Sequence, residues 1–253
     1  MELDGAGVVV TGAAAGIGEA LARRFAAAGA RVVLADLDGP GVMRVAESVG
    51  GLAVPGDAAS PDGVARLIAA ARAHLGEIDL YCANAGVGGA SDLADEAGWD
   101  LSWQVNVLAH VRAARELLPD WLARGRGHFL ATVSAAGLLT MLGAPAYSVT
   151  KHGALAFAEW LSATYGDRGI TVQALCPQGV RTAMLDASGK AGELLLSATA
   201  IGADEVADAV MAGLEDGSFL ILPHPEVARY YSGRAADTDR WLAGMRKAQQ
   251  MLD

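Results

Sequence analysis

The chain has 253 residues, 53% of them hydrophobic and 32 of them glycine, which suits one large α/β domain with a sizeable core. Its 19 Lys and Arg residues against 29 Asp and Glu residues give a net charge of −10, which disfavours binding to nucleic-acid phosphates. No apolar run reaches the roughly 18 residues of a membrane span and the N-terminus lacks signal-peptide features, so we expect a cytoplasmic protein without membrane or nucleic-acid partners.

Cysteine usage and chain organisation narrow the protein class further. Cys82 and Cys176 are the only cysteines, and each stands inside an apolar run. We expect two buried thiols, because a metal site needs more ligands at closer spacing and disulfides are rare inside cells. The sequence has no internal repeat, low-complexity segment or inter-domain linker. We therefore expect a single domain over residues 1–253, without a bound metal.

The first predicted unit is a strand, a glycine loop, a helix and a second strand. Residues 7–11 form a β-branched run, and the loop GAAAGIG follows at residues 12–18. A helical pattern with Leu21 and Phe25 on one face then leads to the strand RVVLAD, which ends in Asp36. Together these elements make a βαβ unit of about 30 residues.

This βαβ unit predicts a dinucleotide site. Glycines let the backbone approach a pyrophosphate, and the helix start at Gly16 and Ile17 offers free N–H groups at the positive end of the helix dipole. The Asp36 carboxylate can accept a hydrogen bond from the ribose 2′-hydroxyl of NAD and would repel a 2′-phosphate. Neither Ala15 nor Leu37 supplies a cation for that phosphate, so the sequence favours NAD over NADP. Because the spacing is Gly-x-x-x-Gly-x-Gly rather than Gly-x-Gly-x-x-Gly, the prediction also depends on the surrounding strands, helix and acid.

Strand and helix signals alternate through the rest of the chain. We expect further strands at residues 52–55, 78–83, 128–133, 170–176 and 219–222. We expect further helices at residues 61–74, 99–124, 145–165 and 203–214. The alternation predicts a Rossmann-type, doubly wound parallel sheet of about seven strands with helices on both faces, in which ligands bind outside the carboxyl ends of the strands. The chemically distinctive residues that fall at those ends are Gly12, Asp36, Asp57, Asn84, Ser134 and Pro177.

The stretch from Ser134 to Lys151 carries the residues best suited to proton transfer. Tyr147 and Lys151 are four residues apart, so on a helix their side chains project from one face. A cation about 5 Å from a phenol, at an effective dielectric constant of about 20, favours the phenolate by roughly 3 kcal/mol, or about two pKa units. Tyr147 could then exchange a proton with a substrate oxygen that Ser134 orients. The alternative is an amphipathic helix with a solvated Tyr/Lys edge.

Three further segments bear on function. Asn106 lies in the middle of the predicted helix 99–124, where an amide is exposed, bonded to a neighbouring carbonyl, or holds a water in a proton path. Residues 182–200 mix Gly, Ala and Ser with apolar side chains, which fits a mobile lid or a pair of surface helices. The tail from Pro225 is rich in aromatic side chains such as Trp241, which predicts packing against another subunit or against that lid.

On these residues the chain closely resembles the short-chain dehydrogenase/reductase family. Its motifs stand here as TGAAAGIG at residues 11–18, ANAG at 83–86, YSVTK at 147–151 and CPQGVRT at 176–182. Asp57, Asn106 and Ser134 complete the set, and Ser134 precedes Tyr147 by the family's spacing of thirteen residues. The resemblance covers the chain to about residue 222 and implies an NAD-dependent oxidoreductase that assembles as a homotetramer or homodimer.

The resemblance also implies a role for each matching residue. Tyr147 would be the general acid/base, Ser134 would hold the substrate oxygen, Lys151 would bind the nicotinamide ribose and lower the phenol pKa, and Asn106 would hold a relay water. The implied cofactor residues are Gly12, Gly16, Ile17 and Gly18 at the pyrophosphate, Asp36 and Leu37 at the adenosine ribose, Asp57 and Ala58 at the adenine, Asn84 and Gly86 along the groove, and Pro177, Gly179, Val180 and Thr182 beside the nicotinamide, with Tyr147 and Lys151.

The substrate pocket is expected to be apolar. We assign to it Gly88, Leu138, Leu139, Ala144 and Gln178, and no Arg or Lys lies in these segments to pair with a carboxylate. A neutral secondary alcohol or ketone is therefore the expected substrate.

Two departures from the family and two alternative functions remain. Ala83 stands where the family usually has Asn, and Gln178 stands where it usually has Gly, which puts the backbone path beside the nicotinamide in doubt.

The alternative functions are an NADPH-dependent ketoreductase, which Asp36 disfavours, and a non-catalytic NAD-binding sensor or scaffold. Proteins of the latter kind typically lose the Tyr or the Lys, and this chain has both.

Overall fold

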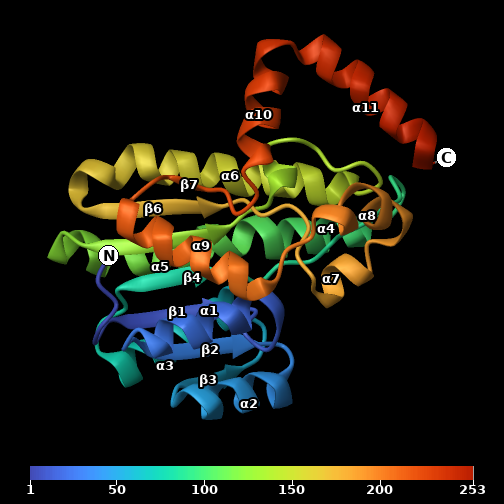
Figure 1. Cartoon of the computed structure of the whole chain (residues 1–253). Coiled ribbons are helices and arrows are strands. Elements are labelled where there is room, and N and C mark those ends of the chain that lie inside the picture. Colours follow the sequence, from blue (N-terminus) through green and yellow to red (C-terminus); the bar gives the residue numbers. More distant parts are fainter. Residues whose placement is uncertain (253) are drawn as a thin grey trace.

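The computed structural model describes residues 1–252, and within them a seven-stranded sheet forms the centre of the molecule (Figure 1). The strands are β1 (Gly7–Thr11), β2 (Arg31–Asp36), β3 (Leu52–Pro55), β4 (Leu80–Ala83), β5 (Gly127–Thr132), β6 (Ile170–Leu175) and β7 (Leu220–Ile221). Their order is β3-β2-β1-β4-β5-β6-β7, and every neighbouring pair is parallel. The predicted doubly wound parallel sheet is confirmed.

Helices cover both faces of this sheet (Figure 1). They are α1 (Gly16–Ala27), α2 (Gly39–Val49), α3 (Pro61–Leu75), α4 (Glu96–Trp103), α5 (Ala109–Arg124), α6 (Pro145–Tyr165), α7 (Ala183–Asp186), α8 (Gly189–Leu195), α9 (Ala203–Asp216), α10 (Glu226–Ala236) and α11 (Thr238–Leu252). Shorter turns are the π-turn η1 (Gln104–Leu108) and the 3₁₀ turns η2 (Ala135–Gly137), η3 (Gly166–Arg168) and η4 (Ser197–Thr199). Within residues 1–252 no helix is long and apolar enough to cross a membrane.

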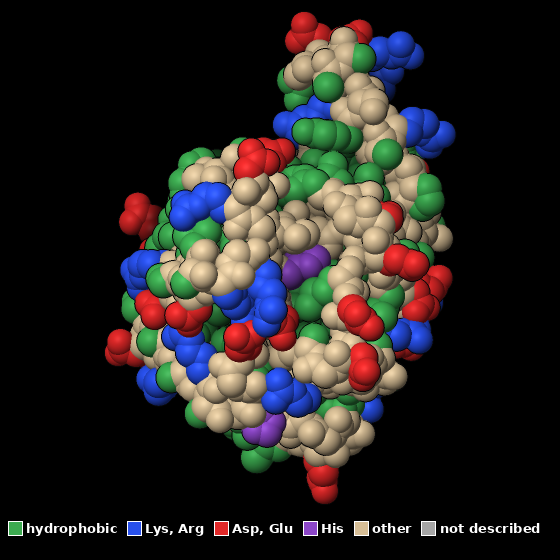
Figure 2. Space-filling model, turned by 90° about the vertical axis from the view of Figure 1, so that its left-hand side faces the viewer, with side chains coloured by type: hydrophobic (Ala, Val, Ile, Leu, Met, Phe, Trp, Pro, Cys, Tyr) green, Lys and Arg blue, Asp and Glu red, His purple; other side chains and the backbone are tan. Residues whose placement is uncertain are grey.

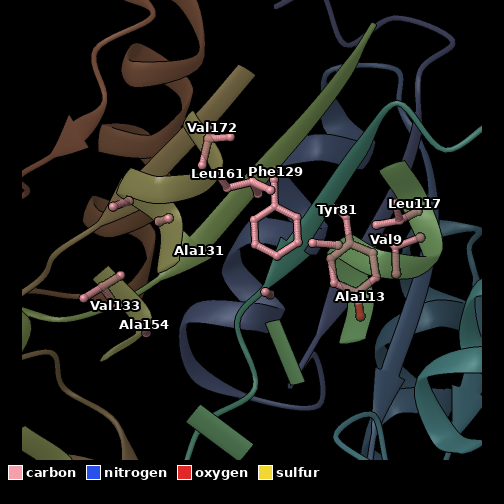
Figure 3. Close-up of a cluster of buried hydrophobic side chains, with 14 of the residues drawn as sticks. Val9, Tyr81, Ala113, Leu117, Phe129, Ala131, Val133, Ala154, Leu161 and Val172 are labelled. Atoms are coloured by element: carbon pink, nitrogen blue, oxygen red, sulfur yellow. The ribbon is translucent and has the colours of Figure 1, made fainter. Parts of the chain in front are cut away.

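Successive side chains of each strand point to opposite faces of the sheet, so the hydrophobic core consists of one layer on each face. Val8 and Val10 of β1 face α1, α2 and α9, whereas Val9 faces α3, α5 and α6. On the second face the rings of Tyr81 and Phe129, from neighbouring strands, stack with 5.8 Å between centroids (Figure 3). Burying one such large apolar side chain contributes about 1.5–3 kcal/mol to stability, so this layer fixes α5 and α6 over the middle of the sheet.

The helix that carries Asn106 differs from the prediction. It begins at Glu96, capped by the Asp95 carboxylate on Gly98 N, and it is interrupted at residues 104–108 by the π-turn. There the N–H of Ala109 donates to the carbonyl of Gln104, five residues back. Such bulges insert one residue into the helical register and frequently occur at functional sites.

One helix and the ends of two strands also differ from the prediction. Helix α2 was not predicted from the sequence, because its two early glycines and Pro40 hide the helical period. Asp38 caps its start, and Gly50 ends it in the left-handed conformation. The strand expected from residue 78 begins at Leu80, and the last strand contains only Leu220 and Ile221.

The segments beyond β6 form short helices and a projecting arm. The predicted lid contains α7, α8 and η4, and its motion stays a prediction. Helix α10 rises from the end of β7, and α11 runs back above α8 (Figure 1). The Tyr230 and Trp241 rings lie 6.4 Å apart, and Lys190 of α8 donates to the Leu252 carbonyl. The arm therefore contacts its own lid, while Leu242 of α11 stays exposed.

Candidate functional site

The carboxyl ends of the central strands bring the predicted catalytic residues together. Ser134 follows β5, the Pro177 segment follows β6, and α6 returns over both. The Ala135 N–H donates to the Pro177 carbonyl at 2.8 Å, so the two strand ends are joined at this edge.

Ser134 holds an unusual backbone conformation. Its φ of 142° lies in a region that L residues rarely occupy, a strain of order 1–3 kcal/mol that the surroundings must offset. Its Oγ accepts from the Ala136 N–H at 3.1 Å and lies 3.5 Å from the Pro177 carbonyl. These contacts position the hydroxyl at the start of η2, beside α6.

Tyr147 and Lys151 lie one turn apart on α6, as predicted. The Lys151 ammonium is 5.6 Å from the centroid of the Tyr147 ring and donates to the Thr132 carbonyl at 2.8 Å. Its side chain is 2% exposed, and burial lowers the pKa of Lys151 to about 8. A cation with little access to water is thus fixed beside a phenol, which excludes the solvated Tyr/Lys edge.

The ionisation of Tyr147 differs from the expectation. Burial raises the pKa of the phenol above its usual value, and a hydrogen bond with the Ser134 side chain opposes this rise. A nearby cation favours the phenolate, but a buried phenolate also loses hydration, which the residue spacing does not show. In the chain without ligands, the effect of burial therefore dominates the pKa of Tyr147.

Asn106 is fully buried in the π-turn and ties three segments together. Its Oδ1 accepts from the Val87 N–H at 3.0 Å, while its Nδ2 donates to the Val87 carbonyl and to the Thr150 hydroxyl, each at 3.0 Å. Both amide protons are therefore used within the protein. Asn106 joins the loop after β4 to α6, the helix that carries Tyr147 and Lys151.

Asn84 has a similar role at the glycine loop. Its Nδ2 donates to the Thr11 carbonyl at 2.9 Å and to the Gly12 carbonyl at 3.3 Å, and its Oδ1 accepts from the Thr132 hydroxyl at 3.0 Å. One side chain thus links the ends of β1, β4 and β5. Because the Thr132 carbonyl also accepts from Lys151, these contacts connect the glycine loop to Lys151.

The glycine loop fits a phosphate group. Gly12 and Gly16 have φ of 66° and 56°, and no side chain caps the N-terminus of α1, so its N–H groups face the loop. A Cβ on Gly18 would lie 1.9 Å from the Gly12 carbonyl oxygen, so only glycine allows this close packing. A Cβ on Gly16 would lie 3.1 Å from Cγ2 of Thr182, which places the segment after β6 beside the loop and Ile17.

Asp36 lies at the end of β2 beside this loop. Its Oδ2 accepts from the Ala14 N–H at 3.0 Å and its Oδ1 from the Asp38 N–H at 2.9 Å. Leu37 is 78% exposed. Arg44 of α2 was not predicted from the sequence as part of this site, and its guanidinium lies 3.4 Å from the Ala14 carbonyl. The Asp36 carboxylate and the Arg44 cation therefore both contact Ala14 of the glycine loop.

Asp57 and Ala58 follow β3 and line a small cavity with Arg66. The Asp57 carboxylate accepts from the N–H groups of Ala59 and Ser60 before α3. Burial raises the pKa of Asp57, but these hydrogen bonds outweigh it and the net pKa is lowered. The carboxylate is ionised and exposed at the adenine end of the predicted groove.

Gln178 is held by a residue that the sequence analysis did not identify. Its N–H donates to Nδ1 of His224 at 3.1 Å, and its side-chain amide lies 3.3 Å from the Thr199 hydroxyl in the lid. Val180 and Ile201 form an isolated parallel bridge next to Gly179. Gln178 thus connects the end of β6 to the end of β7 and to the lid.

The predicted substrate wall is partly buried in the core. Leu138 and Leu139 are 1% and 9% exposed and pack with the second core layer, whereas Ala144 and Gln178 are partly exposed. The wall segments carry no Arg or Lys, but a cation from a distant segment lies beside them. Arg234 of α10, 96 residues away in sequence, donates to the Leu138 carbonyl and lies 3.0 Å from Nε2 of His152.

The surface at the amino ends of the strands, opposite the candidate site, carries paired charges. Figure 2 shows this face, where acidic and basic side chains alternate. A cavity there is lined by residues that include Arg72 and Arg124, and these pair with Asp120 and Glu77. Within residues 1–252 no cluster of potential metal ligands occurs, and both cysteines are buried free thiols.

Comparison with known proteins agrees with this arrangement. A family model described as short chain dehydrogenase matches residues 6–192. The chain is 36% identical over 243 residues to a 1-deoxy-11-beta-hydroxypentalenate dehydrogenase of Streptomyces exfoliatus. The alignment covers 89% of this chain and 86% of the relative. It is 30% identical over 187 residues to a D-beta-hydroxybutyrate dehydrogenase of Rhizobium meliloti, with coverages of 70% and 72%. A solved structure of a short chain dehydrogenase/reductase from Burkholderia phymatum in complex with NAD matches with a TM-score of 0.88 at 27% identity, over 94% of this chain and 96% of the other.

Replacing Gly18 with alanine tests the glycine loop. The added Cβ would also lie 2.7 Å from Asn84 Nδ2, so the loop must shift. We expect a loss of about 1–3 kcal/mol in the free energy of unfolding, a fall in Tm of about 2–10 °C, and affinity for a nicotinamide dinucleotide at least about tenfold weaker. Thermal unfolding and equilibrium titration with NAD and with NADP measure these changes. Gly166→Ala is the control, because no atom lies within 4 Å of its Cβ position. Equal behaviour of the two variants would contradict the close packing.

Proposed function

The chain belongs to the short-chain dehydrogenase/reductase family, and on that premise we propose that it is an NAD-dependent dehydrogenase that interconverts a secondary alcohol and a ketone. The observation that carries this proposal is the buried Lys151 ammonium beside Tyr147, with Ser134 at the adjoining strand end. The oxidoreductase class itself follows from the family, whose relatives named above are dehydrogenases of hydroxylated compounds.

The chain's own residues fit the cofactor. Gly12, Gly16, Ile17 and Gly18 would hold the pyrophosphate at the uncapped start of α1, and Asp36 would hold the adenosine ribose. The segment from Pro177 to Thr182 would hold the nicotinamide end. Bound NAD would accept a hydride from the substrate carbon.

Proton transfer is assigned to the side chains of Ser134, Tyr147 and Lys151. The Ser134 hydroxyl orients the substrate oxygen, and the Tyr147 phenolate takes its proton during oxidation. Phenolate has to form within a site that raises its pKa, so a cation beside it is required. Lys151 supplies that cation, and its ammonium is the dominant species below a pH of about 8.

We propose NAD rather than NADP because of Asp36. Its carboxylate is partly exposed at the end of β2, where it would repel a 2′-phosphate. Arg44 supports the alternative NADPH-dependent ketoreductase, because it brings a cation to the same loop. The balance of these two charges decides the cofactor.

The proposed substrate is a neutral alcohol of apolar bulk. The wall segment 138–144 has no charged side chain, and the Arg234 guanidinium is already engaged by the Leu138 carbonyl and His152. A hydroxy acid is the second candidate. Arg234 favours it by standing close to that wall, and so do the hydroxy-acid names of two relatives.

Assembly into a homotetramer or homodimer is part of the proposal. Leu101, Trp103 and Trp160 on α4 and α6 are 54%, 42% and 53% exposed, and Leu242 on α11 is 47% exposed. Exposed apolar side chains of this size support contact with another subunit.

Changing Tyr147 to Phe tests the proton-transfer role. We expect alcohol oxidation to fall by about 10²–10⁴-fold, because the variant has no group to accept the proton, while the Kd for NAD stays within about threefold. Steady-state absorbance of the reduced cofactor and an NAD titration measure the two quantities. Tyr165→Phe, at the other end of α6, is the matched control. Oxidation that survives in the Tyr147→Phe variant would disprove the role.

A wild-type chain that binds NAD but oxidises no alcohol in a broad screen would instead support the sensor or scaffold alternative.

Changing Asp36 to Ala tests cofactor choice. Removing the carboxylate leaves the Arg44 cation in contact with Ala14, so we expect the ratio of kcat/KM for NAD to that for NADP to fall at least about tenfold. In the Asp36→Ala, Arg44→Met double variant, most of the gain for NADP should disappear. An unchanged ratio in the single variant would show that Asp36 does not select the cofactor.

Substrate charge is tested with matched pairs of secondary alcohols, with and without a carboxylate on the same skeleton. We expect kcat/KM for the neutral member to exceed that for the anion by about tenfold, because the wall offers the anion no free cation. A preference for the anion that is lost in Arg234→Met would reject the neutral substrate and support the hydroxy acid.

A further inference from the structure

Arg234 attaches the C-terminal arm to the wall segment 138–144 of the proposed substrate pocket. It lies on α10, and in the stretch 231–240 it is partly buried while its neighbours are exposed. Its Nη1 donates to the Leu138 carbonyl and lies 3.0 Å from Nε2 of His152. One guanidinium nitrogen of the arm thus contacts both the start of the wall and the helix α6.

The contact with His152 fixes the hydrogen-bonding state of that ring. Arginine can only donate hydrogen bonds, so Nε2 of His152 accepts. Nδ1 lies 2.9 Å from the Ser148 carbonyl oxygen, which can only accept, so Nδ1 carries the proton. Both ring nitrogens are therefore used, and His152 links Arg234 to the backbone of α6.

Ser148 attaches the middle of the wall to the same helix. Its buried hydroxyl accepts from the Met141 N–H at 2.8 Å and lies 3.2 Å from the Met141 carbonyl, to which it can donate. Together with the two contacts of Arg234, this attachment closes a ring. The ring runs from α10 to the start of the wall, from the wall to α6, and from α6 back to α10 through His152.

The wall needs such contacts, because its backbone conformation is unfavourable on its own. Thr140 and Gly143 have φ of 82° and 73°, in the left-handed region. Glycine adopts this region readily, but a β-branched residue such as Thr140 rarely does, and it remains there only where its surroundings hold it. Thr140 lies between the two attachment points, Leu138 and Met141. The contacts of Arg234 and of α6 therefore restrain the strained part of the wall.

We propose that Arg234 is a positioning residue that fixes the wall segment 138–144 relative to Tyr147 and so determines which apolar substrates fit the pocket. Tyr147 directly precedes Ser148, so a wall tied to α6 is also held in place relative to the phenol. The arm would thus contribute to substrate selection, although it lies beyond the sequence motifs, which end at residue 182. This inference rests on the proposed alcohol oxidation, because it concerns the substrate pocket of that reaction.

A direct contact between Arg234 and an anionic substrate is the rival role. In that role, loss of the guanidinium would weaken the binding of anions and leave neutral alcohols unaffected. In the positioning role, neutral alcohols that fill the pocket are affected as well, because the wall itself moves. Neutral substrates of different size therefore separate the two roles.

The first test compares neutral secondary alcohols in the wild type, Arg234→Met and Arg229→Met. Arg229 is exposed on the same helix, 5.3 Å from the centroid of the Tyr230 ring, so its variant controls for the loss of one positive charge. The quantity measured is the ratio of kcat/KM for an alcohol with two bulky apolar substituents to that for the smallest secondary alcohol that the wild type oxidises. We expect this ratio to fall about fivefold or more in Arg234→Met, mainly through a higher KM for the bulky alcohol, and to stay within about twofold in Arg229→Met.

This ratio does not depend on the fraction of enzyme that is folded. A general loss of stability would lower both rates and leave the ratio unchanged, and an unchanged ratio in Arg234→Met would overturn the proposal. An equal fall in Arg229→Met would overturn it as well. If Arg234→Met does not fold, Arg234→Ala replaces it.

Hydrogen exchange measured by mass spectrometry gives a readout that is independent of activity. In the wild type the Met141 N–H is bonded to Ser148, and the Leu139 N–H donates to the Ala135 carbonyl at 2.8 Å. In Arg234→Met the amides of residues 138–144 should exchange about fivefold faster or more, while those of β5 keep their rate. Wild-type exchange in the wall of the variant would refute the inference. If the wild-type chain oxidises no alcohol, the proposed function fails, and hydrogen exchange still decides whether Arg234 holds the wall.

Discussion

A buried ammonium beside a phenol is the interaction on which the rest of this site depends. Removing a charge from water costs several kcal/mol, and Lys151 offsets part of that cost with the Thr132 carbonyl. This carbonyl lies at the carboxyl end of β5, two residues before Ser134, so one strand end supports the lysine and carries the hydroxyl. The hydrogen bond from Lys151 to the end of β5 also fixes the position of α6 along that strand. Tyr147, one helical turn earlier, is thereby placed as well.

The parallel sheet makes this arrangement possible by collecting distant segments at one edge. Asn84 links the ends of β1, β4 and β5, and His224 links the end of β7 to the segment after β6. Asn106 ties the loop after β4 to α6 from a π-turn that alters the helical register. Side chains expected to touch a ligand are thus also structural links between strands. A change at one of them will alter the geometry of the site as well as its chemistry.

The sequence predicted the parts of the fold and site that depend on local spacing. The glycine loop, the acid after the second strand, and the Ser134, Tyr147 and Lys151 set were all found in this way. Helix α2 was missed because its signals are caps at residues 38 and 50 rather than a clear apolar period. The π-turn has no recognisable pattern in one sequence. Arg44 and Arg234 were missed because long-range folding brings them to the loop and to the pocket wall. The spacing of Tyr147 and Lys151 predicted a lowered phenol pKa, whereas burial raises it, and burial cannot be read from residue spacing.

The central claim is that the Lys151 ammonium governs the ionisation of Tyr147. The most direct measurement is an ultraviolet pH titration of phenolate in the wild-type chain minus that in Tyr147→Phe, repeated with both chains carrying Lys151→Met. The account predicts that the difference signal, which belongs to Tyr147, moves to higher pH when the cation is removed. A midpoint that stays the same or falls in the Lys151→Met background would contradict it.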